Sequence, residues 1–156
     1  MATDDLAARV MDVLKANRVL TLACRDADGC WAVAVYYVVR GHTLVFCSSA
    51  KSRHVRALQF DARQAGEVHA DSADWRSILG VQLSGRVEGV PAGEVEDARR
   101  DYAARFPFVD DNADPVLAQA LRGASWFRYR IERAVLIDNT NGFGQRLAWD
   151  VREAPG

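Results

Sequence analysis

Apolar and polar residues alternate with two different periods along the chain, and the first period is helical. The apolar positions near the start are Leu6, Val10, Val13 and Leu14. They recur three to four residues apart behind Thr3, and Asp4 and Asp5 stand where the start of a helix favours negative charge. The pattern predicts an amphipathic helix over residues 4–16.

Three β-rich runs follow this helix and are separated by turn residues. They read RVLTLAC, CWAVAVYYVV and HTLVFCS, with DADG and RG between them. Short strands joined by tight turns predict an antiparallel meander. After a loop and a short helix, GEVHA predicts one more strand.

The run GVQLSGRVEG has the clearest period of two. One face carries Val81, Leu83, Gly85 and Val87, and the other carries Gln82, Ser84, Arg86 and Glu88. This alternation predicts a strand with one face in the core and the other in water.

The second half of the chain predicts two helices and two strands. A helix begins at Pro91, and its apolar stripe consists of Val95, Ala98, Tyr102 and Phe106. FPFVDDNADP predicts a loop, VLAQALR a short helix, WFRYRIERAVLID a long strand, and NTNGFG a turn before the last strand, RLAWDV. Short strands, tight turns and few helices favour a mainly β fold, an antiparallel barrel that is closed or nearly closed, with helices outside.

Length and composition favour one soluble domain over residues 1–156, with 49% hydrophobic and 26% charged residues. The longest apolar run, residues 31–39, is too short to cross a bilayer, so we expect no membrane partner. The first residues lack the pattern of a secretory signal, which favours the cytoplasm. A net charge of −1 creates no positive field for nucleic acid.

The cysteines are not arranged as metal ligands or as a redox motif. Cys24, Cys30 and Cys47 are odd in number and lack CxxC spacing. We expect all three to be small buried hydrophobic residues and expect no metal site.

The stretch FCSSAKSRHVRAL, residues 46–58, carries the main chemical signal. A helix that begins near Ser52 has unpaired N–H groups and partial positive charge at its start, which disfavours Lys51, Arg53 and Arg56 there. An anion at the strand end removes this conflict, because hydroxyl, N–H and guanidinium groups donate to phosphate. A solvated basic helix start with serine caps explains the same residues equally well. The candidate set, called the phosphate cradle below, is Ser48, Ser49, Ser52 and Arg53.

Motifs for other chemistries are missing from the sequence. It contains no GxGxxG, GxxxxGK, HExxH or GxSxG, and the three histidines, His42, His54 and His69, lie in unrelated surroundings. A phosphate site without a catalytic motif fits a cofactor that brings its own reactivity, such as a flavin. AVAVYY beside LVFC could line a flavin ring, although ordinary strand core is the commoner reason for such runs.

The order of these segments resembles the FMN-binding split barrel of the pyridoxamine 5'-phosphate oxidase-like superfamily. The resemblance is carried by AVAVYY, LVFCSSAKSRH, Trp75 and GVQLSG. Within that superfamily, RHVRAL, GVQLSGRVE, DYAARFP and DNTNGFGQRLAW are similar to the uncharacterised YhbP-like family. The likeness spans nearly the whole chain.

The resemblance implies an FMN site between the two subunits of a homodimer. The backbone of residues 32–37 would flank the flavin ring, and Cys47 and Ser48 would lie near the ribityl chain and phosphate. Arg53 and His54 would bind the phosphate. No residue is assigned a catalytic role.

The same resemblance implies contacts from the second half of the chain. Gln82 is similar to a glutamine that approaches the ring, although its spacing to Gly85 differs from the oxidase pattern. Asn139, Asn141, Phe143 and Arg146 would close the pocket from the partner subunit, with turn structure as the other reading of the asparagines. The candidate cofactor-binding residues are Ala34, Val35, Tyr36, Tyr37, Cys47, Ser48, Ser49, Ser52, Arg53, His54, Gln82 and Phe143.

Two departures from the oxidase argue against oxidation of pyridoxamine phosphate. Tyr37 replaces a basic residue for the substrate phosphate, and the C-terminal motif that bears arginine and histidine is missing. We expect an FMN-dependent oxidoreductase that acts on a small substrate or a reduced nicotinamide. A flavin-binding carrier or stress-related protein without turnover is the alternative, and a barrel that has lost its cofactor is a third. Deazaflavin or haem replaces FMN elsewhere in the superfamily, but no histidine here has the surroundings of a haem ligand.

Overall fold

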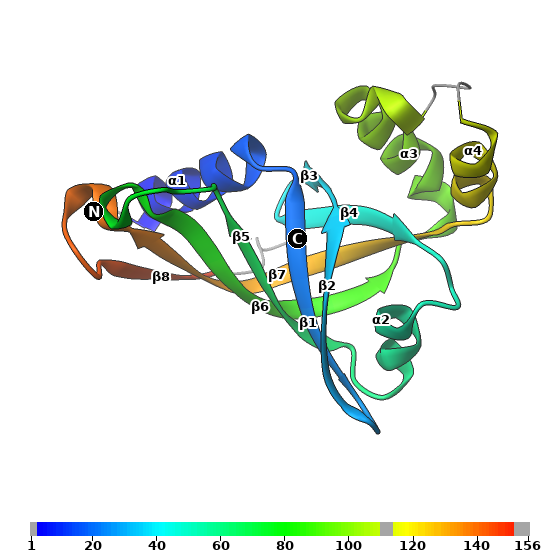
Figure 1. Ribbon diagram of the computed structural model, residues 1–156, viewed down its shortest axis with the longest axis horizontal. Helices are drawn as coiled ribbons and strands as arrows, with labels where there is room; N and C mark the ends of the chain where they lie inside the picture. Colours follow the sequence, from blue (N-terminus) through cyan, green and yellow to red (C-terminus); the bar gives the residue numbers. More distant parts are fainter. Residues whose placement is uncertain (1–2, 110–113, 152–156) are drawn as a thin grey trace.

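The protein is built on one antiparallel sheet of eight strands that curls into a half-barrel (Figure 1). A computed structural model describes residues 3–109 and 114–151. The strand order is β2-β1-β5-β6-β7-β4-β3, and β8 pairs with β7. The strands are β1 (Val19–Asp26), β2 (Gly29–Tyr36), β3 (Val38–Arg40), β4 (Thr43–Ser48), β5 (Arg63–His69), β6 (Leu79–Gly89), β7 (Ser125–Asp138) and β8 (Arg146–Asp150). The split barrel predicted from the sequence is confirmed.

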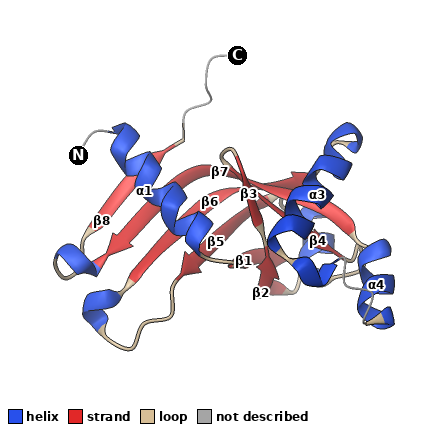
Figure 2. Ribbon diagram, turned by 90° about the horizontal axis from the view of Figure 1, so that it is seen from above, coloured by secondary structure: helices blue, strands red, loops and turns tan. Residues whose placement is uncertain are grey.

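Four α-helices lie in the described part of the chain and surround this sheet. They are α1 (Thr3–Ala16), α2 (Arg53–Arg56), α3 (Val95–Arg105) and α4 (Pro115–Arg122). Figure 2 shows α3 and α4 at one end of the sheet, and α1 with β8 toward the other end. No helix among the described residues is both long enough and apolar enough to cross a membrane.

The first four strands do not form the single meander that the sequence predicted. β1 pairs with β2 and β3 pairs with β4, but the two hairpins lie at opposite edges of the sheet. The chain changes partner at Tyr37, whose N–H donates to the carbonyl of Arg18 at 3.1 Å. Because AVAVYYVV is apolar on both faces, its pattern does not reveal where the change occurs.

The apolar face of α1 packs on the sheet, as its period predicted. Val10 and Leu14 are completely buried in the same cluster as Leu20 and Leu136. Burying an aliphatic side chain of this size stabilises a fold by about 1.5–3 kcal/mol. The hydroxyl of Tyr37 donates to the carbonyl of Leu14 and so ties the end of α1 to the sheet.

β6 and β7 form the longest ladder and position the second half of the candidate site. β6 alternates as predicted, with its odd-numbered residues from 81 to 87 buried. In β7, Ile131 pairs with Gly85 and Arg133 pairs with Ser84, so Glu132 has no partner on β6 and forms a β-bulge. The alternation of buried and exposed residues in β7 shifts at this point. Gly85 is required at this point, since a Cβ there would lie 2.0 Å from the carbonyl oxygen of Arg130.

The cysteines differ in their surroundings, and the expectation that all three are buried is wrong for one of them. Cys24 is buried and Cys47 is half-buried, but Cys30 is exposed on the edge strand β2. All three are free thiols.

Candidate functional site

The stretch between β4 and α2 folds as the sequence predicted, into a strand end, a turn and a short helix. β4 ends at Ser48, and α2 begins at Arg53 with Ser52 as its N-cap. The Ser52 side chain does not cap the helix, because its hydroxyl donates to the carbonyl of Ser49 at 2.8 Å. The serine-cap explanation of this segment therefore fails for Ser52.

Two hydroxyls of the segment meet beside a buried imidazole. Nε2 of His54 lies 2.8 Å from Oγ of Ser48 and 3.4 Å from Oγ of Ser52, and the two hydroxyls are 3.3 Å apart. His54 is buried, and this burial lowers the pKa of its imidazole, which favours the neutral form at pH 7. His54 thus orients Ser48 and contributes no positive charge to a bound anion.

Arg53 turns away from these hydroxyls and already has an anionic partner. Its Nε and Nη2 atoms donate to the two carboxylate oxygens of Asp26 at 2.8 and 3.0 Å, and its guanidinium lies 4.7 Å from the centre of the Trp31 ring. The hydrogen bond from Arg53 lowers the pKa of Asp26. Asp26 is the last residue of β1, and its carboxylate offsets part of the positive charge that suggested a phosphate.

The predicted ring-binding strand, β2, is an edge of the sheet and has an exposed outer face. Ala34 and Tyr36 point outward, and the Tyr36 ring packs 5.1 Å from Phe106, measured between ring centres. Val35 is half-buried and Tyr37 is buried. The Tyr37 side chain is therefore part of the core, and only its backbone could reach a ligand on the outer face.

Cys47 lies one residue before the end of β4, beside the hydroxyl of Tyr102 in α3. Burial raises the pKa of its thiol, which keeps it protonated near neutral pH. A protonated, half-buried thiol is a poor nucleophile, so Cys47 provides packing next to the hydroxyls.

Gln82 and Phe143 lie away from the phosphate cradle within one chain. Gln82 is exposed in β6, and Phe143 follows the 3₁₀ turn Asn139–Asn141 just before β8. Figure 1 places β8 and α2 at opposite ends of the sheet. The structure therefore brings Ser48, Ser52 and His54 together, and it does not bring Gln82 or Phe143 to them.

The turn before β8 accounts for both asparagines without a ligand. Asp138 accepts hydrogen bonds from the backbone N–H of Thr140 and from the amide of Asn141. Asn139 is buried and donates to the carbonyl of Trp75 at 2.9 Å. Turn structure thus accounts for the asparagines, whereas Phe143 is 80% exposed and its ring meets the Trp75 ring edge to face, with 5.5 Å between centres.

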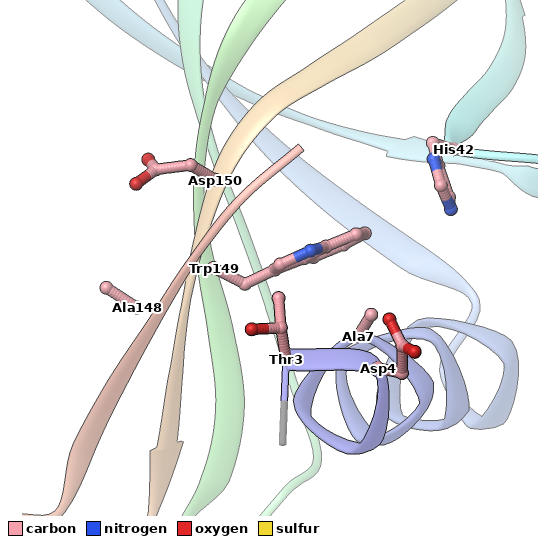
Figure 3. Close-up of a pocket in the computed structure, with 7 residues that line it drawn as sticks. All are labelled: Thr3, Asp4, Ala7, His42, Ala148, Trp149 and Asp150. Atoms are coloured by element: carbon pink, nitrogen blue, oxygen red, sulfur yellow. The ribbon is translucent and has the colours of Figure 1, made fainter. Parts of the chain in front are cut away.

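A cavity of about 690 Å³ lies beside the start of α1, away from all the predicted site residues. Figure 3 shows the indole of Trp149 reaching over Asp4 and Ala7, with His42 beyond it and Asp150 pointing away. The rings of Trp149 and His42 meet edge to face at 5.2 Å. None of the candidate cofactor-binding residues lines this cavity.

The sequence comparisons identify the class of protein. Residues 7–136 match the profile of the family described as "Pyridoxamine 5'-phosphate oxidase", and the chain belongs to this family. More particularly, it is similar to the UPF0306 protein YhbP of Escherichia fergusonii. The two are 27% identical over 138 residues, which cover 87% of each chain.

Solved structures share the fold at lower identity. A structure described as a heme binding protein from Mycobacterium smegmatis matches with a TM-score of 0.69 and 24% identity, over 96% of this chain and 58% of that one. A structure described as a FAD-binding protein from Mesorhizobium loti matches with a TM-score of 0.66 and 23% identity, over 82% of this chain and 91% of that one. These likenesses establish the split-barrel fold.

Proposed function

We propose that the protein binds FMN between two copies of the chain and is an FMN-dependent oxidoreductase of the cytoplasm. The observation that carries the proposal is the cluster of Ser48, Ser52 and His54 at the end of a strand, in a segment that also contains the cationic residues Lys51 and Arg53. Membership of the oxidase family and the likeness to a protein described as binding FAD support a flavin.

The donor set at the strand end fits a phosphate group. Ser49 and Lys51 are exposed, and the hydroxyl of Ser49 accepts the Lys51 backbone N–H at 3.2 Å, which orders the turn. The Nη1 atom of Arg53 is not used in its pair with Asp26. The Ser49 hydroxyl, the Lys51 ammonium and the Nη1 group of Arg53 are donors of the kind that a phosphate accepts from, so these residues would hold it. Ser52 would join them by turning its hydroxyl away from the carbonyl of Ser49.

The outer face of β2 would hold the flavin ring. As an edge strand, β2 has backbone N–H and C=O groups on one side that no strand in the described part of the chain pairs, and Ala34 leaves room beside them. A bound flavin supplies the acceptor for hydride or electrons. The chain itself would position the ring, exclude water from one face with Tyr36 and hold the phosphate.

A homodimer is part of the proposal because apolar side chains remain exposed at both ends of the sheet. Val19 and Tyr36 are cross-strand partners on the outer face of the β1–β2 hairpin, and both are more than 40% exposed. Trp75 and Phe143 form an exposed pair at the β8 end. A symmetric pair of chains that joined these ends would place Phe143 of each copy near the partner's cradle and form two equivalent sites.

The first test is whether the purified protein is yellow and takes up FMN. Absorbance, flavin released on heating and a titration followed by flavin fluorescence give the stoichiometry, and one flavin per chain is expected. Oxidation of reduced nicotinamide above the rate of free FMN would distinguish an enzyme from a flavin carrier.

A parallel titration with haemin tests the other cofactor found among structural relatives. Colourless protein that takes up no FMN would refute the proposal, and a sharp Soret band with one haemin per chain would replace flavin with haem.

A further inference from the structure

A groove of about 410 Å³ crosses the solvent-facing side of the sheet, outside the phosphate cradle. Four of its residues form one row across four neighbouring strands. In this row His69 of β5 pairs with Gly80 of β6, and Ile137 of β7 lies between Gly80 and Arg146 of β8, paired with both. Glu67 and Gln82 form the next row on the same side. A volume of this size accommodates a small organic molecule.

Gly80 makes the floor of the groove from backbone alone. A Cβ at this position would lie 2.9 Å from Cβ of His69 and 3.0 Å from the carbonyl oxygen of Val68, closer than side chains tolerate. The absence of a side chain therefore opens the space between His69 and Ile137 and gives the imidazole its place.

Glu67 fixes the orientation of the His69 ring. Nδ1 of His69 lies 2.7 and 2.8 Å from the two carboxylate oxygens of Glu67. A carboxylate accepts only from a protonated nitrogen, so Nδ1 carries the proton and Nε2 of the neutral ring carries a lone pair. In the neutral ring, Nε2 is then an oriented hydrogen-bond acceptor at one wall of the groove.

Arg146 supplies positive charge at the opposite wall. It lies three strands from His69, or roughly 14 Å between backbones at the usual strand spacing, and both side chains reach into the space between them. It forms no ion pair with any carboxylate in the described part of the chain. Glu67 is occupied by His69, and the other carboxylate that lines the groove, Asp71, comes two residues after His69 in the chain. The positive charge of Arg146 enters the groove from β8, at the far end of the row from His69.

We propose that this groove binds a small organic acid that carries a hydroxyl or amino group at its other end. The acid group pairs with Arg146, the apolar body lies over Gly80 and Ile137, and the O–H or N–H donates to Nε2 of His69. Gln82 belongs both to this groove and to the proposed flavin shell, so the ligand would lie beside the flavin if both bind. The groove itself is complete without a flavin.

Benzoate and 4-hydroxybenzoate are matched probes, because both carry a carboxylate and only the second carries a distant hydroxyl. Titrations of the full chain, followed by ¹H–¹⁵N NMR with and without FMN, give the two dissociation constants. The hydroxyl should tighten binding about three- to tenfold, the range for one net hydrogen bond. Arg146→Gln should weaken both probes about tenfold or more.

Variants of the two walls distinguish the proposal from nonspecific binding. His69→Phe keeps an aromatic ring without the acceptor, so it should remove the advantage of 4-hydroxybenzoate and leave benzoate unchanged. Glu67→Gln should reduce the same advantage. Arg122→Gln, on the exposed end of α4, is the matched charge control and should change neither constant.

Failure of either probe to bind, or an advantage that persists in His69→Phe, would overturn the groove proposal. Probe binding without FMN uptake would refute the flavin proposal alone, and FMN uptake without probe binding would refute the groove alone. The NMR spectrum of each variant reports whether it is folded.

Discussion

Substituting Arg53 and substituting its partner Asp26 should change the affinity for FMN in opposite directions. Two of the five N–H groups of Arg53 bind the Asp26 carboxylate, which leaves its Nη1 group for a phosphate. Arg53→Ala should therefore weaken FMN binding and hardly change riboflavin binding, because riboflavin has no phosphate. One or two hydrogen bonds between charged groups correspond to about ten- to a hundredfold in affinity.

Asp26→Asn should act in the opposite direction. The carboxylate of Asp26 repels a phosphate held by the same guanidinium, and its removal frees the other two N–H groups of Arg53. At a partly exposed site this repulsion is screened, so we expect FMN to bind roughly three- to tenfold more tightly, again with little change for riboflavin.

Fluorescence titration of both flavins with both variants measures these effects, and salt should reduce them. Arg56→Ala is the control, because Arg56 is exposed at the end of the same helix and has no part in the pair. Equal losses for FMN and riboflavin in both variants would show that Arg53 and Asp26 only brace the β1–β2 turn against α2. That result would refute the role of Arg53 in the phosphate cradle.

Three further predictions concern stability and assembly. Gly85→Ala should destabilise the fold by about 3 kcal/mol or more in urea unfolding, because its Cβ would collide with backbone, whereas Gly93→Ala, with open space around it, should change stability by less than about 1 kcal/mol. Burial lowers the pKa of His54 in the folded protein, so the unfolded chain binds more protons and the free energy of unfolding should fall as the pH drops below about 6.5. Urea unfolding of His54→Gln over the same pH range should lack this part of the pH dependence. FMN should lower the protein concentration at which dimers dissociate in sedimentation and should raise Tm. Phe143→Ala should reduce flavin retention. A monomer that binds FMN with full affinity would contradict the proposed flavin site between two chains.

Elements with one unambiguous period could be predicted from the sequence. α1 and β6 each have one apolar face and one polar face, and both fold over nearly the predicted residues. The strand–turn–helix order around Ser48 was also predicted, with a helix that begins near Ser52, although the Ser52 side chain does not cap that helix and the first turn is basic.

Features that depend on contacts distant in sequence could not be predicted. The partner change at Tyr37 lies inside a run that is apolar on both faces, so no local signal marks it. The pairing of Asp26 with Arg53 joins a turn to a helix far along the chain, and only the acidic turn DADG hinted at a carboxylate there. The Glu67–His69 pair has the i, i+2 spacing of two side chains on one face of a strand, and this spacing alone does not show that the two side chains contact each other.

The sharing of β7 between β4 and β8 has a consequence for how the chain folds while it is being synthesised. Cys47 of β4 pairs with Trp126 of β7, so the ribosome must extend the chain well beyond α3 before this ladder can form. Until then the β3–β4 hairpin has an open edge, and the apolar side chains of Leu44 and Phe46 lack the Phe127 and Tyr129 rings that later cover them. A nascent chain arrested before β7 should therefore be a chaperone substrate or aggregate, whereas one released after β8 should fold.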